Sequence, residues 1–286
     1  MNVINGASYA GNPVNNTVMY ITKKVEHLVE NLRSISGCLV FIEENVIVPE
    51  DISQKHQFVR TDNPQGDYAA YVNEIYEERL QAEKAKAYTC CDGMYTIGDN
   101  VKIGQNAYIE PGVFIGHDVI IGDNAVIKAN AIIKQAVIGD NFIACEGCTI
   151  GMFGFTMAKD ACGNNVRIPT LGKVKIGNNV EVGTNTSISC GSSGDTIIED
   201  NVKIDTLVHV AHDVHIHKNA EIPAGVILGG YSDIGENVFI GINSAVRNRK
   251  TVGDNAYIGM GTVVTKDVEA GTTVVGNPVR KLEKKG

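Results

Sequence analysis

The chain has 286 residues, of which 43% are hydrophobic, and its formal net charge is −8 at pH 7. This length suits one large domain and one small one, and the acidic balance excludes broad nucleic-acid binding. No apolar run reaches the roughly 18 residues of a membrane helix. Seven scattered cysteines without a disulfide framework indicate reduced thiols and a cytoplasmic location.

The first part of the chain, residues 1–88, has no internal repeat and is predicted to be a small α/β domain, a candidate for nucleotide binding. Runs of apolar residues predict strands, and apolar residues at helical spacing predict helices. The expected elements, in chain order, are a strand at Val18–Thr22, a helix at Lys24–Ser34, a strand at Cys38–Ile42, a candidate strand at Gln57–Arg60, and a charged connecting helix at Tyr68–Lys86.

From about Tyr95 onward an aliphatic residue recurs at every sixth position, often followed by Gly. A period of six fits neither an amphipathic helix nor an alternating strand. It predicts short strands joined by sharp turns and stacked as a parallel β-helix, in which Gly and Asn tolerate the left-handed turn conformation. Three hexapeptides form one triangular coil, so residues 18 apart are expected to stack on one wall. The predicted fold class is therefore mainly β, a left-handed β-helix at 89–278.

The repeat has two interruptions, at residues 152–173 and around Ser192–Asp195, and then thirteen rungs are expected without a break from Ile198 to Ala270. A long loop inside a regular repeat is usually functional, so Phe153 and Phe155 are candidates for lining a substrate site. Pro278 is expected to end the repeat, and residues 279–286 form a basic tail.

Four of the seven histidines lie within the segment VHVAHDVHIH, at His209, His212, His215 and His217. Val210 and Ile216 are the inward positions, so His212 is expected near a corner of the prism, where it can meet a neighbouring subunit. Gly230 lies 18 residues beyond His212 and is expected to stack on it, and Asn248 follows after 18 more, beside Arg249.

A neutral imidazole beside an accessible backbone N–H suits acyl transfer. The imidazole would remove a proton from an incoming amine or hydroxyl, and the Gly230 N–H would hold the oxyanion of the tetrahedral intermediate. Either Asp205 or Asp213 could orient the His212 ring.

The stretch from Ile150 to His212 resembles the UDP-3-O-acylglucosamine N-acyltransferases of lipid A synthesis. The resemblance is carried by IGMFGF (150–155), RIPTLGKVKIGNNVEVGTNTSI (167–188) and KIDTLVHVAHDV (203–214), and more faintly by TVMYITKKVEHLVENL and TDNP in the N-terminal part. The resemblance implies that His212 is the general base, that Asp205 belongs to the active site and that the Gly230 N–H forms the oxyanion hole. It also implies a homotrimer with sites between subunits.

The chain departs from this family in three ways. The uridine-binding pattern after the first strand is absent, although Tyr20 keeps an aromatic ring there. Arg249 stands where the family has a second active-site histidine. The helices that receive acyl carrier protein in the family are missing, which favours acyl-CoA over acyl carrier protein as the donor.

The C-terminal third resembles the acetyl-CoA-dependent acetyltransferases of nucleotide-linked amino sugars, through AHDVHI and IGMGTVVTKDVEAGTTVVGNPVRKL (258–282). This resemblance implies a catalytic pair at His212 and Asp213. It also implies that the final coils hold the donor, with Gly259, Met260 and Gly261 as candidates. The basic residues Arg280 and Lys281 could contact phosphates of the donor.

These patterns predict an enzyme, a homotrimeric N-acyltransferase that moves an acyl group from a thioester to the amine of a nucleotide-linked amino sugar, for lipid A or surface-glycan synthesis. Candidate substrate contacts are Tyr20, Phe153, Phe155, His209, Asn248 and Arg249. No tightly bound cofactor and no metal are expected, since Cys145-x-x-Cys148 lacks a second cysteine pair. The alternative is a non-catalytic scaffold, or a zinc protein of the carbonic-anhydrase kind that uses His209, His212 and His217 across subunits.

Overall fold

The computed structural model describes residues 4–277 and 279–281 and divides the chain into two units. The first unit comprises residues 1–82, 154–172 and 192–194, and the second comprises 83–153, 173–191 and 195–286. Most of the segment predicted as a loop of the β-helix domain, residues 154–172, thus groups with the N-terminal part. Pro278 and the end of the basic tail, residues 282–286, lie outside the described residues.

The first unit is built on a parallel sheet with strand order β1-β2-β3-β4. Its elements are β1 (Gly6–Ala7), β2 (Thr17–Ile21), the 3-10 helix η1 (Lys23–Ser34), β3 (Leu39–Glu43), α1 (Glu50–Ser53), β4 (Gln57–Thr61), α2 (Pro64–Lys84), β16 (Met157–Lys159) and β17 (Asn165–Arg167). The strands and helices predicted for this part are confirmed, with the first helix wound as a 3-10 helix. β1 and α1 were not predicted, because both are too short to give a periodic signal in the sequence.

The hairpin of β16 and β17 belongs to the first unit because it completes one of that unit's apolar clusters. Ala158 and Ile168 are buried with Tyr68 and Val72 of α2. The carbonyl of Lys159 accepts a hydrogen bond from Asn63 Nδ2 at 2.9 Å. The apolar residues of this insertion therefore serve as a core for α2, which explains why the repeat is interrupted here.

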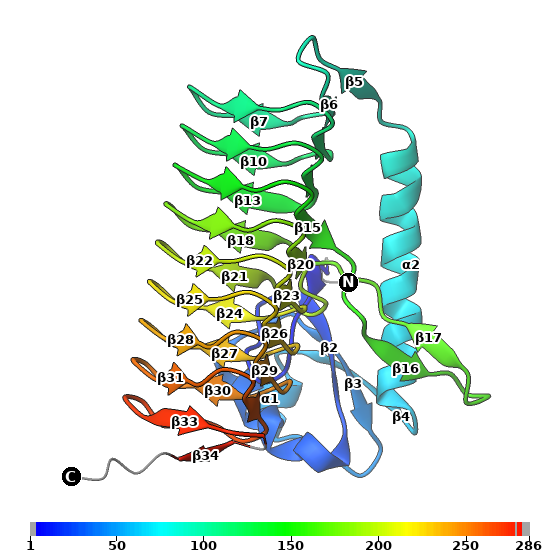
Figure 1. Ribbon diagram of the computed structural model, residues 1–286. Helices are drawn as coiled ribbons and strands as arrows, with labels where there is room; N and C mark the ends of the chain where they lie inside the picture. Colours follow the sequence, from blue (N-terminus) through cyan, green and yellow to red (C-terminus); the bar gives the residue numbers. More distant parts are fainter. Residues whose placement is uncertain (1–3, 278, 282–286) are drawn as a thin grey trace. The chain divides into compact units, whose positions relative to one another are not determined.

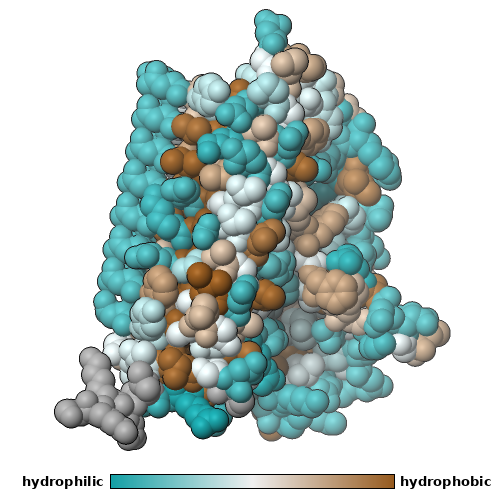
Figure 2. All heavy atoms as spheres, in the orientation of Figure 1, coloured by the Kyte–Doolittle hydropathy of each residue, from teal (hydrophilic) through white to brown (hydrophobic). Residues whose placement is uncertain are grey.

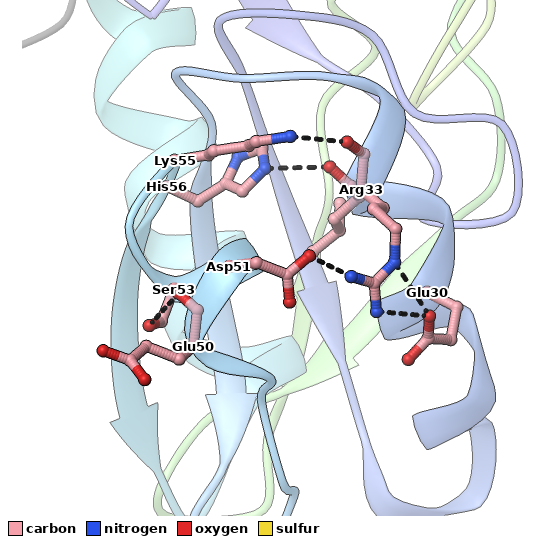
Figure 3. A network of polar contacts seen from close by, with 8 residues as sticks. Glu30, Arg33, Glu50, Asp51, Ser53, Lys55 and His56 are labelled. Atoms are coloured by element: carbon pink, nitrogen blue, oxygen red, sulfur yellow. Dashed lines mark hydrogen bonds and ion pairs between the residues drawn. The ribbon is translucent and has the colours of Figure 1, made fainter.

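A polar network ties η1 to the segment before β4 (Figure 3). The Arg33 guanidinium contacts Glu30 and Asp51, and the Lys55 ammonium donates to the Arg33 carbonyl at 2.9 Å. The buried His56 ring lies with Nε2 3.0 Å from the Leu32 carbonyl, and its Nδ1 accepts a hydrogen bond from the Cys38 N–H at 3.2 Å. Both nitrogens of His56 are therefore used, which fixes the ring.

The second unit is a left-handed parallel β-helix whose described strands form three walls, and Figure 1 shows them stacked as successive coils. The first wall contains β5 (Tyr88–Cys90), β6 (Thr96–Gly98), β9 (Phe114–Ile115), β12 (Ile132–Ile133), β15 (Thr149–Met152), β20 (Ser187–Ser189), β23 (His209–Val210), β26 (Ile227–Leu228), β29 (Ala245–Val246) and β32 (Val263–Val264). The second wall contains β7 (Lys102–Ile103), β10 (Ile120–Ile121), β13 (Ala136–Ile138), β18 (Val174–Ile176), β21 (Thr196–Ile198), β24 (His215–Ile216), β27 (Asp233–Ile234) and β30 (Thr251–Val252). The third wall contains β8 (Tyr108–Ile109), β11 (Val126–Ile127), β14 (Ile143–Ala144), β19 (Glu181–Val182), β22 (Lys203–Ile204), β25 (Glu221–Ile222), β28 (Phe239–Ile240), β31 (Tyr257–Ile258), β33 (Thr273–Val275) and β34 (Arg280–Lys281).

The predicted core of aliphatic columns is confirmed. Val210, Leu228, Ile216 and Ile234 are fully buried, and they belong to one apolar cluster that runs through the β-helix. Each such side chain contributes about 1.5–3 kcal/mol on burial, so the stack of coils holds itself together without helices. Regular spacing holds from Ile198 to Val264. The prediction that it continues unbroken to Ala270 is wrong, because Val252 pairs with Val268, 16 residues later instead of 18.

The three corners differ in the residue that adopts the left-handed conformation. The corner between the second and third walls carries a ladder of asparagines, in which Asn219 bonds to Asn237 and Asn237 to Asn255. The corner between the first and second walls instead places Asp213, Tyr231 and Arg249 at φ values of 57–60°. Bulky residues are uncommon in this conformation, so this column departs from the rule that shapes the other corner.

Candidate functional site

The structure places His212 at the corner between the first and second walls, between β23 and β24, as the sequence predicts. Its Nδ1 lies 2.8 Å from Oδ2 of Asp213. The side chains are 12% and 6% exposed, respectively. An Nδ1–H that donates to a carboxylate leaves Nε2 as the unprotonated, basic nitrogen. The pair thus presents a base whose orientation is fixed by its sequence neighbour.

The backbone of Asp213 is anchored by a buried hydroxyl of the preceding coil. Its backbone N–H donates to Oγ1 of Thr196 at 2.9 Å, and Thr196 is fully buried. Its left-handed φ of 57° turns the chain sharply at this point. The turn therefore positions the Asp213 carboxylate, and the carboxylate in turn orients the His212 ring.

Gly230 stacks on His212, as the 18-residue repeat predicts. A Cβ at Gly230 would stand only 2.7 Å from both Cε1 and Nε2 of the His212 ring. In the part of the chain that the structure describes, the Gly230 N–H donates to no backbone carbonyl, whereas Gly229 and Tyr231 on either side both do. A glycine at this position lets the imidazole approach the backbone closely, beside an amide that the coil stacking does not use.

Tyr231 adds an aromatic ring that the sequence analysis did not single out. It lies edge-on to the His212 ring, with centroids 5.2 Å apart and an interplanar angle of 88°. The Arg249 guanidinium lies over the Tyr231 ring, 4.2 Å from its centroid. The 18-residue spacing of Asp213, Tyr231 and Arg249 could have revealed this column, because two bulky residues stand where a left-handed turn favours Asn or Gly.

Asp205 does not orient His212 within one chain. It is exposed at the corner between the third and first walls, where its Oδ1 accepts from the Thr206 N–H at 2.7 Å. It lines a groove with Glu181, Lys203 and Glu221. Of the two carboxylates proposed from the sequence, Asp213 is the one that contacts the ring, because the corner turn projects it there.

His209 lies on the outer face of the first wall, with Nδ1 2.9 Å from Oγ of Ser187. Desolvation, and to a smaller extent the nearby His212, lower the pKa of His209. Asn248 and Arg249 are exposed at the His212 corner. The structure therefore gathers these predicted substrate contacts near His212 in the second unit.

The aromatic candidates divide between the units. Phe153 belongs to the second unit and is 48% exposed, whereas Phe155 belongs to the first and is 78% exposed, with Arg167 stacked on its ring at 5.4 Å. Tyr20 packs against Tyr68 in the first unit, with centroids 5.2 Å apart. Their roles toward a substrate stay predictions.

The donor candidates lie on another part of the β-helix. Gly259, Met260 and Gly261 follow β31 at the corner between the third and first walls, where Met260 is 75% exposed. Arg280 and Lys281 form the exposed β34, and the Lys281 ammonium contacts Glu269 at 2.9 Å. Their contact with a donor stays a prediction.

Among the described residues, His209, His212 and His217 do not form a metal-binding cluster within one chain, as the zinc alternative would require in a single subunit. His217 instead groups with Glu199 and His215. Burial raises the pKa of Cys148 to about 12, which keeps that thiol protonated.

Of the helices in residues 4–277 and 279–281, none combines the length and apolar character needed to cross a bilayer.

Comparison with known proteins identifies the repeat and its relatives. The family model of "Bacterial transferase hexapeptide (six repeats)" matches residues 100–135, 195–230 and 231–266. A UDP-3-O-acylglucosamine N-acyltransferase of Caulobacter sp. is 34% identical over 149 residues, which are 52% of this chain and 44% of that protein. UDP-3-O-acylglucosamine N-acyltransferase 2 of Legionella pneumophila is 40% identical over 144 residues, which are 50% of this chain and 42% of that protein.

Among solved structures, the UDP-N-acetylglucosamine acyltransferase of Campylobacter jejuni has a TM-score of 0.59 at 22% identity, covering 66% of this chain and 72% of that one. It supports the fold. The chain spans less than half the length of the curated relatives above. The resemblance predicted from the sequence is thus confirmed: the chain carries the hexapeptide repeats of bacterial transferases and is similar, over about half its length, to UDP-3-O-acylglucosamine N-acyltransferases.

Proposed function

We propose that the protein is an N-acyltransferase that moves an acyl group from a thioester to the amine of a nucleotide-linked amino sugar. The observation that carries the proposal is the His212–Asp213 pair, whose ring is packed against Gly230. The similarity to enzymes named UDP-3-O-acylglucosamine N-acyltransferase supports the substrate class.

In this mechanism the Asp213 carboxylate accepts the Nδ1–H of His212, so Nε2 takes a proton from the sugar amine as that amine attacks the thioester carbonyl. The developing oxyanion is placed at the Gly230 N–H, which the coil stacking leaves unused. Collapse of the tetrahedral intermediate forms the amide and expels the thiolate, which recovers the proton from His212. No metal is required by these steps.

Arg249 is proposed to contact the anionic part of the nucleotide, because its guanidinium is held over the Tyr231 ring, beside the proposed general base His212. Tyr20, Phe153, Phe155, His209 and Asn248 are kept as candidate substrate contacts. Met260, with Gly259 and Gly261, is kept for the acyl donor, with Arg280 and Lys281 for its phosphates. The donor is an acyl thioester, with acyl-CoA as the first choice and acyl carrier protein as the alternative.

The proposed assembly is a homotrimer with sites between subunits, in the cytoplasm. Apolar side chains remain exposed on the β-helix, among them Ile227 at 50% and Ile120 at 39%. Figure 2 shows apolar patches between hydrophilic residues on the visible face of the molecule. Such surface is suited to contact with further copies of the chain.

The direct test offers acyl-CoA and acyl-loaded carrier protein in parallel to the purified protein, with UDP-, dTDP- and GDP-linked amino sugars as acceptors. We expect amide formation with one nucleotide class and its loss in His212→Ala, while size-exclusion chromatography shows an unchanged assembly. A His212→Ala protein that still forms the amide at the parent rate would reject the mechanism. Failure of every donor and acceptor would favour the scaffold reading.

A further inference from the structure

A second group of chemistry-bearing side chains lies on the outer face of the second wall, apart from the His212–Asp213 pair. His215 lies in β24 with His217 two residues later, so both leave the strand on the side opposite the buried Ile216. Strand register sets His215 between Ile197 of β21 and Asp233 of β27. Glu199, just after β21, and Asp233 therefore flank the two imidazoles from the neighbouring coils.

The donor atoms converge on one point. Glu199 Oε1 lies 2.8 Å from His215 Nε2 and 3.2 Å from His217 Nδ1. One ligand atom of each of these three residues lies within 4.8 Å of the others, and their side chains are 27–32% exposed. Ligands of a tetrahedral zinc ion with bonds of about 2.0–2.2 Å stand about 3.3–3.6 Å apart, so small rotamer changes bring the three atoms to coordination distance.

The two nitrogens of His217 both face carboxylates. Nδ1 faces Glu199, and Nε2 lies 3.1 Å from Oδ1 of Asp233. A neutral imidazole has a single N–H and can donate to only one of them. A cation at Nδ1 satisfies Glu199 and His217 together, and it leaves Nε2–H to donate to Asp233. Metal-binding histidines are commonly oriented by such a carboxylate on the second nitrogen.

The two rings also lie against each other. The His215 and His217 imidazoles stack with centroids 3.8 Å apart and an interplanar angle of 28°. His215 then offers Nε2 and His217 offers Nδ1 toward the same carboxylate oxygen. Because stacked rings direct their lone pairs side by side, the two imidazoles must turn apart to bind one ion. The backbone positions of the three ligands on two adjacent coils are already set.

We propose that Glu199, His215 and His217 bind one divalent transition-metal ion, Zn²⁺, with Asp233 as the positioning residue for His217. Two imidazoles and one carboxylate suit zinc, and the fourth coordination position is taken by water. The ion joins the coil of β21 to the coil of β24. This site uses neither His209 nor His212 and does not depend on the proposed acyl transfer.

The test titrates ZnCl₂ into the tag-free, chelator-treated full chain at pH 7.5, by calorimetry, with Co²⁺ absorption as a second readout. We expect one ion per chain and visible Co²⁺ bands of a low-coordinate N/O site. The double variant His215→Ala/His217→Ala should lose the ion, and Asp233→Asn should weaken binding about 10–100-fold. Circular dichroism confirms that each variant is folded.

Two matched variants locate the ion. His209→Ala removes an imidazole from the adjacent wall, and Cys145→Ser removes a half-exposed thiol; both should keep one zinc per chain. The proposal is overturned if the parent protein binds no stoichiometric zinc and gives no Co²⁺ bands. It is equally overturned if the double variant still binds, or if either matched variant loses the ion.

Discussion

The His212 imidazole occupies the space into which a Cβ on Gly230 would project, with Cε1 and Nε2 both 2.7 Å from that position. Real Cβ atoms do not approach other atoms so closely, so Gly230 is required by the His212 ring that packs against it. The same contact sets the basic nitrogen beside the Gly230 amide. One stacking relationship of the repeat therefore places the proposed base and the proposed oxyanion donor together.

Gly230→Ala is expected to reduce amide formation about 100-fold, because a displacement of the base by about 1 Å has costs of that order. The added methyl meets the end of a side chain, not backbone, so the free energy of unfolding should fall by only about 1–3 kcal/mol. Initial rates and urea unfolding measure the two effects.

Gly6→Ala is the control, since a Cβ at Gly6 has no atom within 4 Å. It should change neither the rate nor the unfolding midpoint. A Gly230→Ala protein with the parent's rate would show that the ring and the amide do not act together.

Asp213→Asn is expected to lower kcat more strongly than Asp205→Asn. Asp213 contacts the ring at 2.8 Å, and an amide in its place can donate to Nδ1 and so stabilise the wrong tautomer. Asp205 does not orient the ring within its own chain. Rates for the two variants under identical conditions decide the matter, and a larger loss for Asp205→Asn would place the orienting carboxylate on a neighbouring copy.

The β-helix could be predicted from the sequence because each coil repeats one local rule. An inward aliphatic such as Val210 or Ile216 and a left-handed Asn such as Asn219 recur at fixed spacing, so no long-range information is needed. The grouping of 154–172 with the N-terminal part could not be predicted. Ala158 and Ile168 pack with Tyr68 and Val72 of α2, which are 86–100 residues away in sequence, and no periodicity encodes that contact.

The site was predictable to the extent that it follows the 18-residue stacking. That rule placed Gly230 on His212, but it could not choose between Asp205 and Asp213, because the choice depends on the direction in which a corner residue projects. The Glu199–His215–His217 cluster was missed for a similar reason. Glu199 and His215 are 16 residues apart, and their contact arises from side chains that lean between coils.

Tyr231→Asn and Leu207→Asn form a pair that separates strain from function. Both residues adopt left-handed φ values, 60° for Tyr231 and 58° for Leu207, at corner positions that favour Asn. A bulky residue there costs about 1–2 kcal/mol. Leu207→Asn should therefore raise the free energy of unfolding by about 1 kcal/mol, whereas Tyr231→Asn should gain less, because its ring contacts with His212 and Arg249 are lost.

The same pair should differ in activity. Without the Tyr231 ring, the Arg249 guanidinium loses the aromatic face on which it packs. Tyr231→Asn should therefore raise KM for the nucleotide sugar several-fold, while Leu207→Asn keeps the parent's KM. Steady-state kinetics with the accepted sugar measure this. Equal KM values for Tyr231→Asn and the parent would remove Tyr231 and its stacked guanidinium from the substrate site.

The pH dependence of stability should depend on His56 in the first unit. Burial, with a smaller contribution from the nearby Lys55, lowers the pKa of His56, and the Leu32 hydrogen bond only partly opposes this. Because the Cys38 N–H donates to Nδ1, the folded state needs the neutral ring. The unfolded chain binds this proton near pH 6.5, so the contribution of His56 is complete above that pH and is lost as the pH falls below it.

One such proton changes the free energy of unfolding by at most about 1.4 kcal/mol per pH unit. We expect urea unfolding, followed by circular dichroism between pH 7.5 and 5, to show this loss in the parent protein. His56→Asn should flatten the curve, because the amide oxygen can accept the Cys38 N–H without titrating. His27→Asn, at an exposed position of η1, should leave the parent's curve unchanged. If His56→Asn retains the full loss of stability below pH 6.5, the acid sensitivity arises from another group, because this variant has no titrating ring at position 56.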